Sequence, residues 1–248
     1  MSFQDHFSAH AGAYAVYRPT YPPQLFSFLA GLVSEPALAW DCATGNGQAA
    51  QALGPYFKRV VATDASNRQI ANAFRAPRVS FVVSAAEHSG LASGCCNLIT
   101  VAQALHWLNL DLFYAECQRV LEKTGVLAAW CYNLLHIEPV LDQIINKFYF
   151  DILGDFWPAE REYIESGYRS IEFPFVELAT PDCHMTASWS LEQLIGYLTT
   201  WSATQRYHTC HGENPLKQIT ADLQAAWGAS QTQRIVTWPL TVRVGRIS

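Results

Sequence analysis

The stretch WDCATGNGQAA at residues 40–50 decides the fold. An apolar run leads into it, Asp41 lies where that run ends, and small residues up to Gly47 form a short loop before a predicted helix. A strand, a tight loop and a helix bring backbone N–H groups and a helix N-terminus close to a bound ligand. Gly45 and Gly47 leave room for that approach because they carry no Cβ atom. Because Asp41 adds a negative charge, the loop suits a ligand with a cationic group at least as well as a pyrophosphate.

A second acid ends the next β-rich run, residues 60–63, and this acid is Asp64. It follows the glycine loop by about 20 residues, the separation at which the acid of a second strand meets a pair of ribose hydroxyls. The alternative is that Asp64 caps a helix that opens near Ser66, and the two roles are compatible.

The chain alternates between strand and helix patterns from residue 36 to residue 133. Strands are predicted near 37–41, 60–63, 79–83, 97–102 and 126–132, and helices near 48–55, 66–74 and 112–122. This rhythm predicts an α/β fold, a mostly parallel sheet with helices on both faces. Asp41, Asp64, Glu87 and Gln103 all fall at or just beyond predicted strand ends, where the ligands of such sheets bind.

The flanking segments complete a three-part organisation. Residues 1–133 are predicted to hold an N-terminal lid, a helix over 23–33 and the cofactor-binding core. Residues 134–232 are rich in aromatic side chains and predict a cap with helices near 191–201 and 216–227 and one sheet strand within 172–188. Residues 233–248 predict a C-terminal strand that completes the core sheet.

Several motifs resemble those of one enzyme family. The pattern Asp41-x-Ala43-x-Gly45-x-Gly47 resembles the D-x-G-x-G-x-G signature of class I S-adenosylmethionine-dependent methyltransferases, with Ala43 in place of the first glycine. VSFVVSAAE at 79–87 and NLITVAQALHW at 97–107 resemble the family's third and fourth strands with the loops that follow them. FYAECQRVLEKTGV at 113–126 resembles the helix and turn before its fifth strand. YRPTYP at 17–22 and ALHW at 104–107 resemble the small-molecule branch, methyltransferase type 11-like, that includes trans-aconitate methyltransferase.

This resemblance implies a Rossmann-like methyltransferase sheet with an antiparallel C-terminal strand, and S-adenosyl-L-methionine as the cofactor. It also implies that Asp64 holds the ribose and that the loop after the third strand flanks the adenine. The cofactor-binding residues that it implies are Tyr17, Arg18, Asp41, Ala43, Thr44, Gly45, Gly47, Asp64, Ala65, Ala86, Glu87, Ala102, Gln103 and Ala104.

His106 and Trp107 follow the fourth strand, where the methyl acceptor of the resembled family approaches. We expect both to be catalytic. Trp107 could place its ring face near the sulfonium, and His106 could orient the acceptor or take a proton. The alternative is a packed His–Trp pair with no role in the reaction.

The composition narrows the class of partner. The chain has 248 residues, half of them hydrophobic, a net charge of −5 and a pI near 5.9, which argues against nucleic acid. No apolar run reaches the roughly 18 residues of a membrane span, and the N-terminus does not read as a signal peptide. The seven cysteines predict reduced thiols in a cytoplasmic protein. The spacing of His208, Cys210 and His211 matches no common zinc pattern, so no metal is expected.

Three functions remain open from the sequence. The first is methyl transfer to a small molecule, with a carboxylic acid as the leading acceptor because Arg18 would pair with it, and a phenolic or polyketide-like molecule as the second. The second is a nicotinamide-dependent oxidoreductase, because Gly45-x-Gly47-x-x-Ala50 fits a dinucleotide pattern. The third is a non-catalytic regulatory protein that binds the cofactor.

Overall fold

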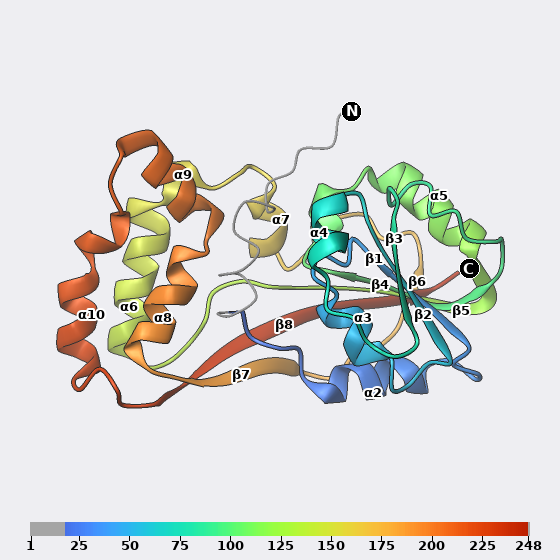
Figure 1. The fold of residues 1–248 in the computed structure, drawn as a ribbon, viewed down its shortest axis with the longest axis horizontal. Coiled ribbons are helices and arrows are strands. Elements are labelled where there is room, and N and C mark those ends of the chain that lie inside the picture. The colour runs from blue at the N-terminus through green and yellow to red at the C-terminus, as the bar shows by residue number, and fades with distance from the viewer. Residues whose placement is uncertain (1–17, 248) are drawn as a thin grey trace.

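The computed structural model describes residues 18–247, so Tyr17 lies outside the described residues. Within this range the strands form one eight-stranded sheet in the order β3-β2-β1-β4-β5-β8-β6, with β7 paired to β8 (Figure 1). The strands are β1 (Leu38–Cys42), β2 (Arg59–Asp64), β3 (Val79–Val83), β4 (Cys96–Ala102), β5 (Leu121–Tyr132), β6 (Val176–Glu177), β7 (Cys183–Trp189) and β8 (Arg234–Arg246). Strands β1 to β5 are parallel and β8 is antiparallel to β5, which confirms the predicted sheet.

The helices connect these strands and build a separate group beyond the sheet. They are α2 (Pro23–Gly31), α3 (Gln48–Leu53), α4 (Asn67–Asn72), α5 (Leu110–Val120), α6 (Pro139–Lys147), α7 (Arg161–Glu165), α8 (Leu191–Thr199), α9 (Ser202–His211) and α10 (Thr220–Trp227). Short helical turns are η2 (Leu105–Trp107), η3 (Phe148–Ile152), η4 (Gly154–Phe156) and η5 (Pro215–Gln218). The local sequence determines where two of these helices begin. Pro23 is the first residue of α2, and Ser190 and Gln193 form a capping box at the N-terminus of α8.

Two apolar clusters cover the two faces of the sheet. Side chains alternate along β5, so Val126 and Ala128 pack with α2 and α3 on one face, and Leu127 and Ala129 pack with α5 on the other. The strand is buried on both faces, as expected of a parallel sheet with helices on each side.

Helices α6, α8, α9 and α10 form a cap that lies apart from the sheet and is seen on the left in Figure 1. The long strand β8 connects the two parts: residues 240–246 pair with β5, and residues 234–240 pair with β7. The expectation of one strand within 172–188 is wrong, because the segment holds β6 and β7. Pro181 lies between them and has no backbone N–H with which to continue a ladder.

Candidate functional site

The loop after β1 has an unusual backbone. Ala43, Gly45 and Gly47 have φ angles of 52°, 56° and 87°, all in the left-handed region that favours glycine. The Thr44 N–H donates to the carbonyl of Thr63 at 2.9 Å, which fixes the loop against the end of β2. The resemblance places glycine where Ala43 stands, and the φ angle of Ala43 gives the physical reason for that preference.

Asp41 lies at the end of β1, buried and beside the loop. It pairs in register with Thr100 of β4, whose hydroxyl donates to the carboxylate at 2.7 Å, and the Thr44 hydroxyl donates to its other oxygen. Burial raises the pKa of Asp41 to about 6, although both hydroxyls act in the opposite direction. The predicted acid therefore lies at the carboxyl edge of the sheet and supports the loop.

Asp64, at the end of β2, joins two loops. One carboxylate oxygen accepts the Gly45 N–H at 2.9 Å, and the other accepts the Ser66 N–H at 2.8 Å. The cap of α4 is the Ser66 side chain, which accepts the Gln69 N–H, so Asp64 is not itself the cap. Ala65 is exposed between these two residues. The strand-end acids Asp41 and Asp64 thus both contact the glycine loop.

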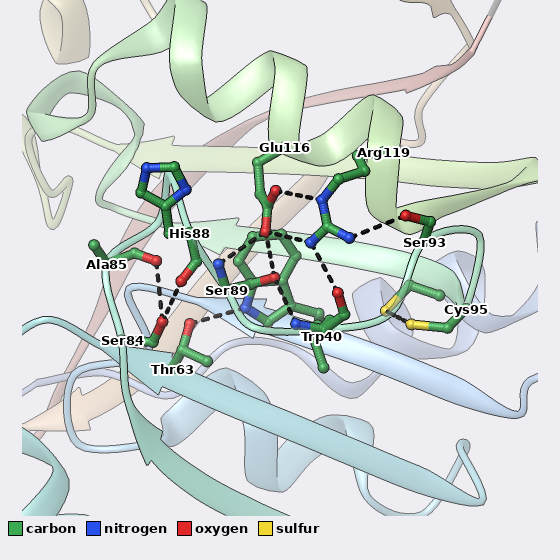
Figure 2. A network of polar contacts seen from close by, with 12 residues as sticks. Trp40, Thr63, Ser84, Ala85, His88, Ser89, Ser93, Cys95, Glu116 and Arg119 are labelled. Atoms are coloured by element: carbon green, nitrogen blue, oxygen red, sulfur yellow. Dashed lines mark hydrogen bonds and ion pairs between the residues drawn. The ribbon is translucent and has the colours of Figure 1, made fainter.

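The loop after β3 carries Ala86, which is buried, and Glu87, whose carboxylate accepts the Asn109 N–H at 3.2 Å. Figure 2 shows how the loop is held: Glu116 of α5 accepts the backbone N–H and the hydroxyl of Ser89 at 2.8 and 2.6 Å. Arg119 donates to the same carboxylate at 2.8 Å and lowers its pKa to about 2. A charged network therefore fixes the loop that the resemblance assigns to the adenine.

Gln103, between Ala102 and Ala104, leaves β4 with a φ angle of 56°. Its side-chain amide donates to the Tyr132 carbonyl at 3.0 Å and accepts the Tyr132 N–H at 2.9 Å. The side chain thereby continues the pairing of β4 with β5 after the β4 backbone has turned away. In the structure this predicted cofactor residue therefore binds the neighbouring strand.

His106 and Trp107 form the η2 turn, with ring centres 4.7 Å apart. His106 is buried, and its Nδ1 lies 2.9 Å from the hydroxyl of Tyr168. Burial, followed by the positive charge of Arg161, lowers the pKa of His106 to about 3. The imidazole is therefore neutral at physiological pH.

A pocket opens between the η2 turn and the cap. Its lining residues are Arg18, Gln103, His106, Trp107, Tyr132, Asn133, Trp157, Pro158, Arg161, Ile164, Tyr197, Trp201 and Ser202. Arg18 donates to the Tyr132 hydroxyl at 2.8 Å, and its guanidinium carbon lies 5.3 Å from the centre of the Tyr197 ring. The predicted residues Arg18, His106 and Trp107 thus meet at one pocket.

Sequence reasoning missed Arg161 and Asn133, which line this pocket, and Tyr168, which contacts the lining residue His106. A usable signal existed for Arg161, because it is a cation in a run rich in aromatic side chains, 148–168. Tyr168 and Asn133 gave no such signal. Tyr168 has a φ angle of 60° and reaches His106 across 62 positions of the chain.

The residues at the sheet edge suit a cofactor with a cationic end and a ribose. A Cβ atom added at Gly45 would meet no described atom within 4 Å, so the loop backbone is open to close approach. The carboxylates of Asp41 and Asp64 accept hydrogen bonds from the neighbouring loop residues Thr44 and Gly45.

Comparison with known proteins identifies methyltransferases as relatives of this chain. The methyltransferase-domain family matches residues 40–129. A protein of Dictyostelium discoideum described as a methyltransferase is 36% identical over 91% of this chain and 87% of its own length. The chain belongs to the class I S-adenosylmethionine-dependent methyltransferases.

A solved structure agrees with this assignment, and a second relative is similar over half of the chain. A structure from Anaeromyxobacter dehalogenans described as a type II methyltransferase has 40% identity and a TM-score of 0.88, covering 93% of this chain and 98% of its own. A protein of Saccharomyces cerevisiae described as an S-adenosylmethionine-dependent methyltransferase is 27% identical over 50% of this chain and 45% of its own length. This methyltransferase therefore uses S-adenosylmethionine, and the comparisons give no support to the nicotinamide alternative or to a non-catalytic role.

Two other features of residues 18–247 complete the description. None of their helices is long and apolar enough to cross a bilayer. His211 packs against the rings of Tyr207 and Phe156, and no group of three or more His, Cys, Asp or Glu side chains in this range could hold a metal ion.

Proposed function

We propose that this methyltransferase acts on a small soluble acceptor, with a carboxylic acid as the leading class. The pocket beside the η2 turn carries the proposal, because aromatic side chains form much of its wall and Arg18 and Arg161 bring positive charge to it. Small-molecule pockets have this composition, mostly apolar with a few placed polar groups. A guanidinium pairs well with a carboxylate. The net charge of −5 supports a partner other than nucleic acid.

The state of His106 supports an acceptor that needs no base. The cofactor supplies a methyl group already activated on a sulfonium, so the chain must mainly align the acceptor and exclude water. A carboxylate is ionised at neutral pH, whereas a phenol must lose its proton. Because the pKa of His106 is lowered to about 3, its imidazole is a weak base for a phenol. A phenolic or polyketide-like acceptor is therefore the second candidate.

The cofactor contacts complete the proposal. The loop from Ala43 to Gly47 borders the amino-acid end, with the ammonium near Asp41, and Ala86 and Glu87 flank the adenine. Asp64 accepts the ribose hydroxyls in addition to the two backbone N–H groups that it holds. Residues 1–133 supply the lid and core, 134–232 the acceptor cap and 233–248 the closing strand. We also propose that the protein is a member of the small-molecule branch of the family, which the motifs YRPTYP and ALHW suggest.

Titration calorimetry with S-adenosylhomocysteine, and with NAD as the competing ligand, tests the cofactor. Transfer of a labelled methyl group to a panel of small carboxylic acids and phenols tests the acceptor. We expect S-adenosylhomocysteine to bind, NAD not to bind, and an acid to be methylated. Turnover confined to phenols would contradict the leading acceptor class.

Replacing Asp64 tests the ribose contact. Two charge-assisted hydrogen bonds contribute on the order of 1.5–3 kcal/mol each, so Asp64→Ala should weaken S-adenosylhomocysteine binding at least tenfold. Asp64→Asn keeps the shape, and Asp182→Asn on the surface is the control. Circular dichroism verifies folding of each variant. Full affinity in a folded Asp64→Ala protein would refute the assignment.

A further inference from the structure

Arg161 is the first residue of α7 and belongs to the wall of the pocket that also contains His106. Tertiary contacts fix its guanidinium from several sides. Its Nε donates to the Tyr149 hydroxyl at 2.6 Å, and its Nη2 donates to Asn133 Oδ1 at 2.6 Å. The guanidinium carbon lies 4.7 Å from the centre of the Trp157 ring, so an aromatic ring also restrains the group.

These contacts use one edge of the guanidinium. An arginine has five N–H donors in a fixed planar arrangement, and the N–H groups of Nε and Nη2 on the inner edge point to Tyr149 and Asn133. The outer edge consists of Nη1 and the second N–H of Nη2. Its geometry allows two parallel hydrogen bonds to be donated to the two oxygens of a carboxylate. The orientation of Arg161 is therefore set before any acceptor arrives.

No direct ion pair with a described residue neutralises the charge of Arg161. Among residues 18–247 no carboxylate lies within ion-pair distance of its guanidinium. Glu165 is linked to Arg161 only through Tyr149. The Tyr149 hydroxyl donates to the Glu165 carboxylate at 2.6 Å, and the hydroxyl oxygen accepts the N–H of Arg161 Nε. The positive charge acts on the pocket, where it is the second cause of the lowered pKa of His106.

The geometry points to Arg161 as the anchor for an anionic group of the acceptor, bound through the outer edge of its guanidinium. This inference rests on the proposed function and adds the residue that determines acceptor specificity. An oxygen held in a charge-assisted pair is a poorer nucleophile than a free one. The anchored group is therefore a binding handle, and the methylated atom belongs to another group of the same acceptor. Asn133, Tyr149 and Trp157 are positioning residues for the anchor.

Ligand titration measures this anchor independently of turnover. Succinate, glutarate and phthalate, each with its dimethyl ester, are titrated into wild type, Arg161→Gln and Arg161→Lys, with and without saturating S-adenosylhomocysteine. Intrinsic fluorescence is a suitable readout because Trp157 lies against the guanidinium and Trp107 and Trp201 line the same pocket. Arg169→Gln is the matched control, an exposed arginine eight positions further along the same segment.

We expect wild type to bind at least one of these acids at least tenfold more tightly than its ester. Arg161→Gln should remove this preference, and Arg161→Lys should restore part of it because lysine keeps the charge but not the two-donor edge. Arg169→Gln should match wild type. In turnover assays on the identified acid, Arg161→Gln should raise KM more than it lowers kcat.

Two results would overturn the anchor: a wild-type protein with no preference for any acid over its ester, or an Arg161→Gln variant that keeps the wild-type preference. S-adenosylhomocysteine should bind all four proteins equally, which verifies that Arg161→Gln is folded. A wild-type protein that does not bind S-adenosylhomocysteine, or that transfers no methyl group, would contradict the proposed function and not the anchor. The titrations without cofactor would still decide the anchor in that case.

Discussion

The neutral ring of His106 carries a single proton, and the Tyr168 hydroxyl faces its Nδ1 at 2.9 Å. Burial raises the pKa of Tyr168 well above its ordinary value, so that hydroxyl keeps its proton. The hydroxyl therefore has a proton to donate to Nδ1, which lies 2.9 Å away. The neutral imidazole then has its N–H at Nε2, where it acts as a donor. His106 therefore suits orientation of an acceptor better than removal of its proton.

The lowered pKa of His106 predicts a pH dependence of stability. Its pKa falls from 6.5 in the unfolded chain to about 3 in the fold, so between these values the unfolded chain binds one more proton. The free energy of unfolding must therefore decrease as pH falls below 6.5, by about 1.4 kcal/mol per pH unit from this group. Between pH 6.5 and pH 5, wild type should lose about 2 kcal/mol more than His106→Asn.

Urea unfolding at a series of pH values measures this difference. His184→Asn, which replaces an exposed histidine, should keep the wild-type pH dependence. Parallel pH profiles for wild type and His106→Asn would show that folding leaves the pKa of His106 unchanged, which would contradict the prediction.

Ala43 is a strained residue in the glycine loop after β1, with a φ angle of 52°. Glycine would relieve about 1 kcal/mol of left-handed strain but would add a similar entropy to the unfolded chain. We expect Ala43→Gly to change the free energy of unfolding by less than about 1 kcal/mol. Ala52→Gly, inside α3, should cost about 1 kcal/mol because glycine is a poor helix former. Chemical denaturation compares them, and an equal loss in both would argue against strain at Ala43.

At the scale of elements, the approach of Phe81 in β3 to Gly47, the N-cap residue of α3, makes the two loop glycines differ in how they would accept a side chain. Gly47 precedes α3 with a φ angle of 87°, and a Cβ atom added there would lie 2.7 Å from the ring of Phe81 in β3. Gly45 has a φ angle of 56°, but a Cβ atom there would have open space around it. A side chain is therefore unfavourable at both glycines, through the backbone alone at Gly45 and through the backbone and the Phe81 ring at Gly47.

Gly45→Ala should destabilise the protein by about 1 kcal/mol through its backbone alone. Gly47→Ala should cost more, because it adds the overlap with Phe81 to a similar backbone strain. Phe81→Leu should recover part of the loss of Gly47→Ala and none of the loss of Gly45→Ala. Thermal unfolding of the single and double variants measures this coupling. Additive losses for Gly47→Ala and Phe81→Leu would contradict the contact.

At the scale of the whole molecule, β8 belongs to both the core sheet and the layer under the cap. Trp238 lies in this strand and is fully buried, with its ring centre 4.8 Å from that of Trp189 and 5.6 Å from that of Tyr197. Its indole N–H donates to the Tyr197 hydroxyl at 3.2 Å. Since β7, β8 and α8 meet at this residue, the cap and the core should lose structure together.

Trp238→Ala should therefore lower the free energy of unfolding by about 3–5 kcal/mol. Ile235→Ala, an exposed position of the same strand, should change it by less than about 0.5 kcal/mol. Urea unfolding of wild type, followed by far-ultraviolet and near-ultraviolet circular dichroism, should show one coincident transition. Separate transitions would mean that the cap unfolds independently of the sheet.

The sequence by itself determined the sheet and its cofactor edge. Strand and helix periods, the glycine loop and the spacing of Asp41 and Asp64 are local properties, and parallel strands bring their carboxyl ends to one edge whatever else the chain does. The C-terminal strand predicted within 233–248 is confirmed as β8, because the apolar residues Trp238, Leu240, Val242 and Val244 recur at every second position.

Only the tertiary structure decided the pocket and the use of each side chain in it. Arg161, Asn133 and Tyr149 meet across intervals of 28 and 12 positions, and Tyr168 meets His106 across 62. No local pattern encodes such meetings, because they depend on how the cap segment folds back against the η2 turn. Gln103 lies at the predicted edge, yet its amide pairs with Tyr132, since β4 turns away there and leaves the backbone of β5 to be satisfied.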